Sequence, residues 1–158
     1  MKFNKTLKNT ILVLFVTLAL SACSTGKKKG SVSGDVYTGT DTVEYLANGV
    51  PDRVFFATNK SSLTTAARET QRKQSTYLRK NKDLNVTIEG HADERGTREY
   101  NLALGERRAN SARDYLMTYG ISGKRISVIS YGKERPVNPA STGLSWSQNR
   151  RSVTVKVN

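Results

Sequence analysis

Short apolar runs with a two-residue period alternate with longer runs of helical period after residue 51. The short runs are rich in Val, Ile and Phe, which favour strands, and they cover residues 52–57, 85–89, 126–130 and 152–157. The helical runs cover residues 63–81 and 97–119. Residues 131–147 hold two of the chain's three prolines among Gly, Asn and Ser residues, which predicts a loop. The order β-α-β-α-β-β predicts an α+β domain of two layers, with helices packed on a mixed sheet.

Both helical runs carry signals for their ends. Ser62, Thr64 or Thr65 can cap the first helix, and Thr97 can cap the second, because hydroxyl oxygens accept the free backbone N–H groups of a first turn. Gly120 matches the C-terminal stop of the second helix. The first helix is expected to bury a weakly apolar stripe made of Ala67, Gln71, Gln74 and Leu78.

The first 22 residues have the layout of an export signal. Three lysines precede an apolar run at residues 11–20, which is too short for a bilayer span of about 20 residues but suits a secretory signal. The sequence Leu20-Ser-Ala-Cys23 then resembles a bacterial lipobox. We expect residues 1–22 to be a lipoprotein signal peptide and Cys23 to carry the lipid. The alternative is an ordinary signal peptide or a short membrane anchor with an incidental cysteine.

Residues 23–51 contain few large apolar side chains and many Ser, Thr, Gly, Lys and Asp residues. Such a segment buries too little surface to offset its ordering entropy. We therefore predict a lipidated flexible linker, followed by a globular domain at residues 52–158. Lys27, Lys28 and Lys29 follow Cys23 closely enough to touch anionic lipid headgroups.

The chain carries 26 basic and 13 acidic residues, a formal charge of +13, which suits an anionic partner or a solvated basic surface. Because the chain is expected to leave the cytoplasm, nucleic acid is not the expected partner. One cysteine excludes an intramolecular disulfide, and a single histidine beside it is too few for a Cys/His zinc site. No metal or cofactor is expected.

Asn101 and Arg108 fall in the middle of the apolar side of the second helix when its residues are placed on a wheel. A buried arginine is costly unless its guanidinium has an anionic partner or a wet cavity. In a structural interpretation, Arg108 pairs with an acid such as Asp93 or Glu89, or extends to the surface. In a functional one, it holds the carboxylate of a ligand.

Asp93 lies in the loop before this helix, where an aspartate is usually a turn or cap residue. A carboxylate and a guanidinium facing one cavity would, however, suit a ligand with an ammonium and a carboxylate. His91 has the chemistry of a general base, but no matching nucleophile is evident, so the chain is not expected to be an enzyme.

Several separated motifs resemble the OmpA C-terminal family, and most of all its peptidoglycan-associated lipoproteins of the Tol-Pal system. They cover about residues 53–157 and occur in order: Gly90-His-Ala-Asp-Glu-Arg-Gly-Thr97, Tyr100-Asn101, Leu104–Asn110, Tyr131-Gly-Lys-Glu-Arg-Pro136 and Asn149-Arg-Arg151. The lipobox and the linker fit these lipoproteins better than a domain linked to a barrel. The resemblance implies a sheet in which the last strand inserts antiparallel between earlier strands.

The resemblance also implies non-covalent binding of peptidoglycan through the meso-diaminopimelate of its stem peptide. Asp93 would engage the amine and Arg108 the carboxylate, while the other implied contacts are Asn101, Thr58, Asn59 and Lys60. Many relatives have Phe-Asp where this chain has Thr58-Asn59, so the carboxylate of those relatives is missing here, whereas the family contacts of this loop that use backbone groups are expected to remain. The implied setting is the outer membrane, facing the periplasm, with a periplasmic Tol propeller protein as a second partner.

Two alternatives belong to other functional classes. A wall-modifying enzyme would need a nucleophile and a base, or a metal, near His91. A basic structural lipoprotein would touch the wall through charge alone, and its binding would weaken steeply with salt.

Overall fold

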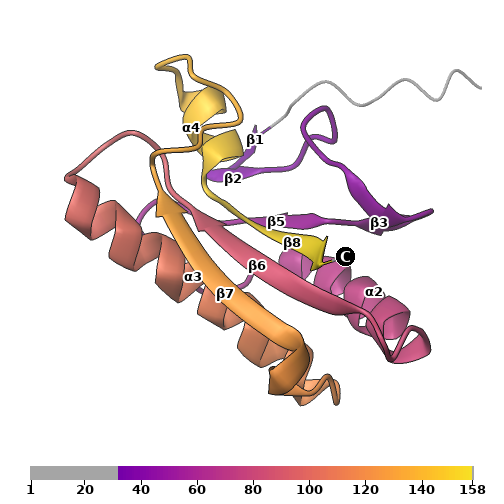
Figure 1. The fold of residues 1–158 in the computed structure, drawn as a ribbon. Helices are drawn as coiled ribbons and strands as arrows, with labels where there is room; N and C mark the ends of the chain where they lie inside the picture. The colour runs from indigo at the N-terminus through magenta and orange to yellow at the C-terminus, as the bar shows by residue number, and fades with distance from the viewer. Residues whose placement is uncertain (1–31, 158) are drawn as a thin grey trace, which may run out of the picture.

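The computed structural model describes residues 32–157. Its main sheet has the strand order β5 (Arg53–Phe55), β8 (Arg151–Val157), β6 (Asn85–His91) and β7 (Ile126–Gly132) (Figure 1). β8 runs antiparallel to β5 and β6, whereas β6 and β7 are parallel. The last strand therefore inserts between earlier ones, as the family resemblance implied.

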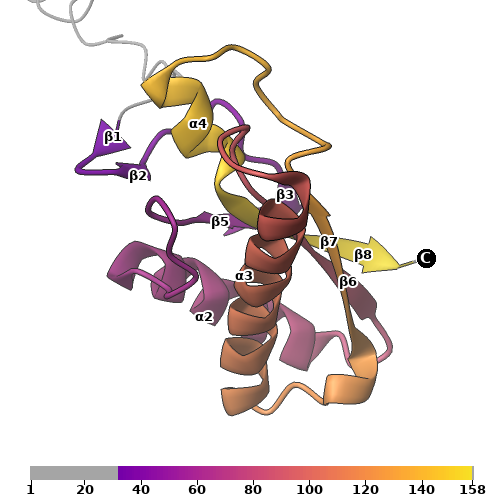
Figure 2. The same cartoon turned by 90° about the vertical axis from the view of Figure 1, so that its left-hand side faces the viewer.

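Two helices cover one face of this sheet, α2 (Thr65–Lys80) and α3 (Arg98–Thr118) (Figures 1 and 2). Thr64 caps α2 by accepting from the Ala67 N–H, and Thr97 caps α3 in the same way. Gly120 follows α3 with φ +82°, which glycine adopts without steric cost. The predicted two-layer α+β architecture and the helix caps are confirmed.

The apolar core lies between α2, α3, β6 and β7 and includes Leu78, Val86, Ile88, Leu116 and Ile126. The stripe predicted for α2 is buried as expected, although two of its residues are polar. The amide of Gln74 donates to the Pro51 carbonyl at 2.7 Å and accepts from the Thr154 hydroxyl at 2.9 Å, whereas the buried Oε1 of Gln71 has no hydrogen-bond partner among residues 32–157. Gln74, with both ends of its amide bonded, is therefore compatible with a core position, but the same explanation does not extend to Gln71.

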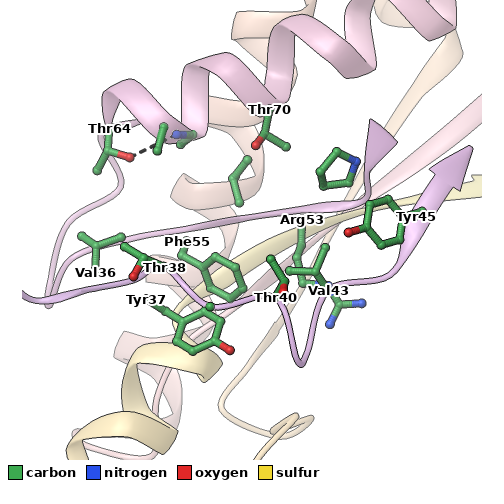
Figure 3. A pocket seen from close by; sticks show the side chains of 15 residues that line it. Val36, Tyr37, Thr38, Thr40, Val43, Tyr45, Arg53, Phe55, Thr64 and Thr70 are labelled. Carbon is green, nitrogen blue, oxygen red and sulfur yellow. Dashed lines mark hydrogen bonds between the residues drawn. The ribbon is translucent and has the colours of Figure 1, made fainter. Parts of the chain in front are cut away.

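The structure differs from the predicted linker over residues 32–51. These residues form four short strands, β1 (Val32–Ser33), β2 (Val36–Tyr37), β3 (Tyr45–Ala47) and β4 (Val50–Pro51), which pair as two hairpins. Tyr37 is buried edge-on against Phe55, with 4.7 Å between the ring centroids, and Val43 packs beside them (Figure 3). The apolar residues here are few, but they bury themselves against the domain, so the segment is ordered. The predictions for residues 1–22 and for Cys23 lie outside the described residues.

The second difference lies in the predicted loop at residues 131–147, which overlaps the helix α4 (Gly143–Asn149). Thr142 caps α4 by accepting from the Ser145 N–H. A short 3-10 helix, η1 (Gly123–Arg125), precedes β7. Among residues 32–157, no helix has both the length and the apolar character needed to cross a membrane.

Candidate functional site

The candidate site lies at the end of the sheet where the loops after β5 and β6 meet. Because β5 and β6 are both antiparallel to β8, they run in the same direction and their following loops emerge together. Helix α3 is held close to β6 at two glycines, Gly105 of the helix and Gly90 of the strand. A Cβ placed on Gly90 would lie only 1.8 Å from the carbonyl oxygen of Gly105, so neither position has room for a side chain.

A cavity of about 280 Å³ opens between these segments. It is lined by Thr58, Asn59, Asp93, Arg95, Gly96, Tyr100, Asn101, Leu104 and Arg108. The structure thus brings together five of the six predicted ligand residues around one cavity. The sixth, Lys60, does not line it and instead contributes its backbone carbonyl, which accepts from Arg108.

Arg108 is fully buried, at 0% exposure, and its guanidinium is held by three backbone carbonyls. Its Nε donates to Lys60 at 2.9 Å, Nη1 to His91 at 2.8 Å and Nη2 to Ala57 at 3.1 Å. Burial, with a smaller effect of nearby Arg150, lowers the pKa of Arg108 to about 10, so it stays cationic at neutral pH. The interpretation that Arg108 pairs with Asp93 or Glu89 is wrong, because its bonded partners in residues 32–157 are neutral carbonyls.

Asp93 is also buried, at 7% exposure, and it pairs with two other arginines. Its Oδ2 lies 2.7 Å from Arg95 Nη2 and 3.2 Å from Arg150 Nη1. Burial acts to raise the pKa of Asp93, but hydrogen bonds from Arg95 and Arg150 outweigh it and hold the pKa below its ordinary value. The carboxylate is therefore ionised at neutral pH and faces the same cavity as Arg108.

Arg150 joins the site to the N-terminal segment, residues 32–51, through a contact that sequence reasoning missed. Its side chain is 3% exposed, and its Nη2 lies 2.8 Å from Asp35 Oδ1. The Asp35 carboxylate also accepts from the backbone N–H and the hydroxyl of Thr58. The Asn149-Arg-Arg151 motif was a signal for Arg150, but nothing in the local pattern indicates its partners.

Asn101 and Asn59 shape the two loops around the cavity. The Asn101 side-chain amide, buried in the first turn of α3, donates to the Arg95 carbonyl at 2.9 Å and so ties the loop after β6 to the helix. Asn59 has φ +55°, a left-handed conformation that asparagine tolerates better than most residues. This backbone turn explains why Asn59 suits its position without an acidic side chain.

A model of the OmpA family matches residues 55–150. The chain belongs to the OmpA family. Relatives in Brucella melitensis and Rhizobium meliloti, both named peptidoglycan-associated lipoprotein, are 43% and 44% identical. The first alignment covers 91% of this chain and 89% of the relative, and the second covers 94% and 88%.

Solved structures agree with this membership of the OmpA family. The peptidoglycan-associated lipoprotein of Burkholderia pseudomallei is similar with a TM-score of 0.65 and 35% identity, over 67% of this chain and 90% of that one. The C-terminal domain of Helicobacter pylori MotB has a TM-score of 0.63 over 68% of this chain and 84% of that one. At 18% identity, the MotB likeness concerns the fold alone.

His91 lies beside the site in this OmpA-family domain but does not line its cavity. The ring is 1% exposed, and neither ring nitrogen has a hydrogen-bond partner. Burial, together with the charges of Arg151, Arg53 and Arg135, lowers the pKa of His91 to about 3. Glu89 Oε2 lies 3.4 Å from Nε2, but a neutral ring forms no ion pair with it at neutral pH. Among residues 32–157, no group of three His, Cys, Asp or Glu side chains could hold a metal ion.

Proposed function

We propose that this chain is a lipoprotein that binds peptidoglycan non-covalently through meso-diaminopimelate and so tethers the outer membrane to the cell wall. The lipid would be carried by Cys23, and the domain would face the periplasm. Membership of the OmpA family and the name shared by the relatives support this proposal. A second partner in the proposal is the periplasmic Tol propeller protein, which would link the chain to envelope integrity and cell division.

The observation that carries the proposal is the pair of opposite charges on one cavity, Asp93 and Arg108, each more than nine-tenths buried. Each end of diaminopimelate has an ammonium and a carboxylate on the same carbon. In our proposal, Asp93 takes the ammonium of the D-centre and Arg108 takes its carboxylate. Buried groups of this kind discriminate strongly, because a ligand that lacks either charge leaves one of them unpaired. Asn101 and the loop of Thr58, Asn59 and Lys60 would hold the ligand through side-chain and backbone groups.

We propose a non-catalytic role. A wall-modifying enzyme would need a base within reach of its substrate, and the one histidine is buried, with a pKa of about 3, and does not line the cavity. This position argues against its use as a general base at neutral pH.

The test is a pull-down of the full chain, in detergent, on purified peptidoglycan at low and high salt. Asp93→Asn keeps the shape of the side chain and removes its charge, and we expect it to weaken binding at least about tenfold, because Arg108 then faces the ligand alone. Arg108→Ala should weaken binding to a similar degree. Binding by the wild type should persist at high salt, since buried charges are screened little.

Two surface residues of α3 supply matched controls. Asp114 is exposed and, within residues 32–157, forms an ion pair only with its neighbour Arg113, and Arg107 is exposed beside Arg108. Asp114→Asn and Arg107→Ala should leave binding unchanged. Because Arg108 also holds three carbonyls, thermal unfolding of each variant separates lost binding from lost folding. If the wild type and all four variants bind equally, and this binding vanishes at high salt, the only interpretation left is a basic lipoprotein that touches the wall through charge alone.

A further inference from the structure

Asp93 has no free side on which to receive a ligand in the present structure. Its Oδ1 accepts from the backbone N–H and the Nε of Arg95, both at 3.1 Å. Its Oδ2 accepts from Arg95 Nη2 at 2.7 Å and from Arg150 Nη1 at 3.2 Å. Since the carboxylate is 7% exposed, a ligand ammonium has to replace one of these donors.

The two arginines differ in their freedom to leave. Arg150 is 3% exposed and has further bonds to the Phe56 carbonyl and to Asp35, so it is fixed from several directions. The Arg95 side chain is 43% exposed and lines the cavity. In the described part of the chain, the other contacts of this side chain are one long hydrogen bond, 3.3 Å from Nη2 to the Thr58 hydroxyl, and the face of the Trp146 ring.

We propose that the Arg95 guanidinium occupies the ammonium position at Asp93, and that diaminopimelate binds by displacing it. This inference rests on the proposed function and adds to it that a side chain of the protein, Arg95, competes with the ligand ammonium for Asp93. While the cavity is empty, Arg95 neutralises a buried carboxylate that would otherwise be paired only with Arg150. Because the ion pair between Arg95 and Asp93 has to be broken when the ligand binds, it lowers the affinity for the ligand. A ligand with a correctly placed cation pairs with Asp93 in place of Arg95, so such ligands are favoured over others.

Trp146 provides a direct reporter of this displacement. The Arg95 guanidinium lies over its ring, 4.3 Å from the centroid, and the indole N–H donates to Glu94 Oε1 at 2.9 Å. Trp146 is the single tryptophan of the chain, so all tryptophan fluorescence comes from this position beside Arg95. Ligand binding should therefore change the Trp146 emission in every protein variant that keeps Arg95.

The experiment measures calorimetric binding of meso-diaminopimelate and of pimelate, which has both carboxylates but no ammonium, to the full chain in detergent. Arg95→Gln removes the competing charge, together with the guanidinium that lies over Trp146, and keeps a polar side chain at this position. We expect it to bind diaminopimelate about fivefold more tightly than wild type, as expected from the strength of a partly exposed ion pair. Its affinity for pimelate should be unchanged, and the change in fluorescence should be lost.

Arg98→Gln is the matched control, because Arg98 is an exposed arginine of the same region that pairs with Glu134, 3.3 Å away, and does not line the cavity. It should behave as wild type, including in fluorescence. Arg95→Lys, which keeps the charge but not the two-pronged geometry, should give intermediate affinity.

Four outcomes separate the possibilities. Tighter binding of diaminopimelate alone by Arg95→Gln supports the displacement. If Arg95→Gln binds diaminopimelate no more tightly than the wild type, and the wild type binds normally, this inference is overturned and the proposed function stays intact. If Arg95→Gln binds both ligands more weakly, Arg95 contacts a ligand carboxylate. No binding of diaminopimelate by any of the four proteins would refute the proposed function itself.

Discussion

His91 stays neutral in the folded protein far below its ordinary titration range, because burial and neighbouring arginines lower its pKa to about 3. In the unfolded chain the ring titrates near pH 6.5. Between these two values the unfolded state binds a proton that the folded state excludes. The free energy of unfolding therefore falls as the pH decreases through this range.

We predict that His91→Gln flattens this pH dependence. From pH 6.5 to pH 4, the wild type should lose about 3 kcal/mol of stability through His91, whereas the variant should lose clearly less. Urea unfolding at pH 7, 5.5 and 4 gives the slope of the free energy of unfolding against pH for each protein. These slopes are compared, and not the absolute stabilities. The pKa of Asp93 is lowered on folding, so its stabilisation is lost progressively below about pH 5, but both proteins share this loss and it cancels when the slopes are compared. Equal slopes for the two proteins would contradict the prediction.

Arg108 shows how far single residues can be interpreted from sequence. Its position among apolar residues was enough to select it, because a buried cation needs a special environment. Its acceptors were not predictable, since Lys60 and Ala57 lie 48 and 51 residues earlier in the chain. Arg150 was left without a role for the same reason, because it contacts Asp35 and Phe56 across 115 and 94 residues.

Helix α3 and strand β6 set the position of the site through their close approach at two glycines. A Cβ on Gly90 would overlap the Gly105 carbonyl, and a Cβ on Gly105 would lie 2.3 Å from the Ser130 hydroxyl. Any added side chain has to push α3 away from the sheet. Because Asn101 and Arg108 are carried by α3, such a shift would also change the cavity.

We predict that Gly90→Ala destabilises the domain by about 3 kcal/mol and weakens wall binding as well. Gly143→Ala is the control, because Gly143 opens α4 and a Cβ there meets no atom within 4 Å. That change should be neutral or slightly stabilising, since alanine is the better helix former. Thermal unfolding with the wall pull-down measures both effects. A stable Gly90→Ala protein would mean that the backbones separate at little cost.

The long elements were predictable because their patterns were regular, whereas α4 was not. α4 has seven residues, and its buried side chains are polar, namely Ser145, Ser147, Gln148 and Asn149. A helix this short with a polar buried face has no apolar periodicity to detect. Its one local signal was Thr142, a residue type that caps helices.

The N-terminal segment makes the folded unit larger than the sequence suggested. We predict that a chain beginning at residue 52 is less stable than one beginning at residue 32 by at least about 2 kcal/mol, because it loses the burial of Tyr37 and Val43 on Phe55. Urea unfolding of the two chains measures the difference. In the longer chain, Tyr37→Ala should reproduce much of this difference in stability. Equal stability would show that the packing of residues 32–51 contributes nothing.

The contact between Asp35 and Thr58 also has a mechanical consequence. The N-terminal segment meets the domain at the rim of the cavity, so both attachment points of the proposed tether lie at one end of the molecule. A pulling force between residue 32 and a bound ligand would act on the contacts of Asp35 with Thr58 and Arg150 before it reached the packing of Tyr37 on Phe55. Under load, this junction would yield first, while the strands of the sheet stayed together.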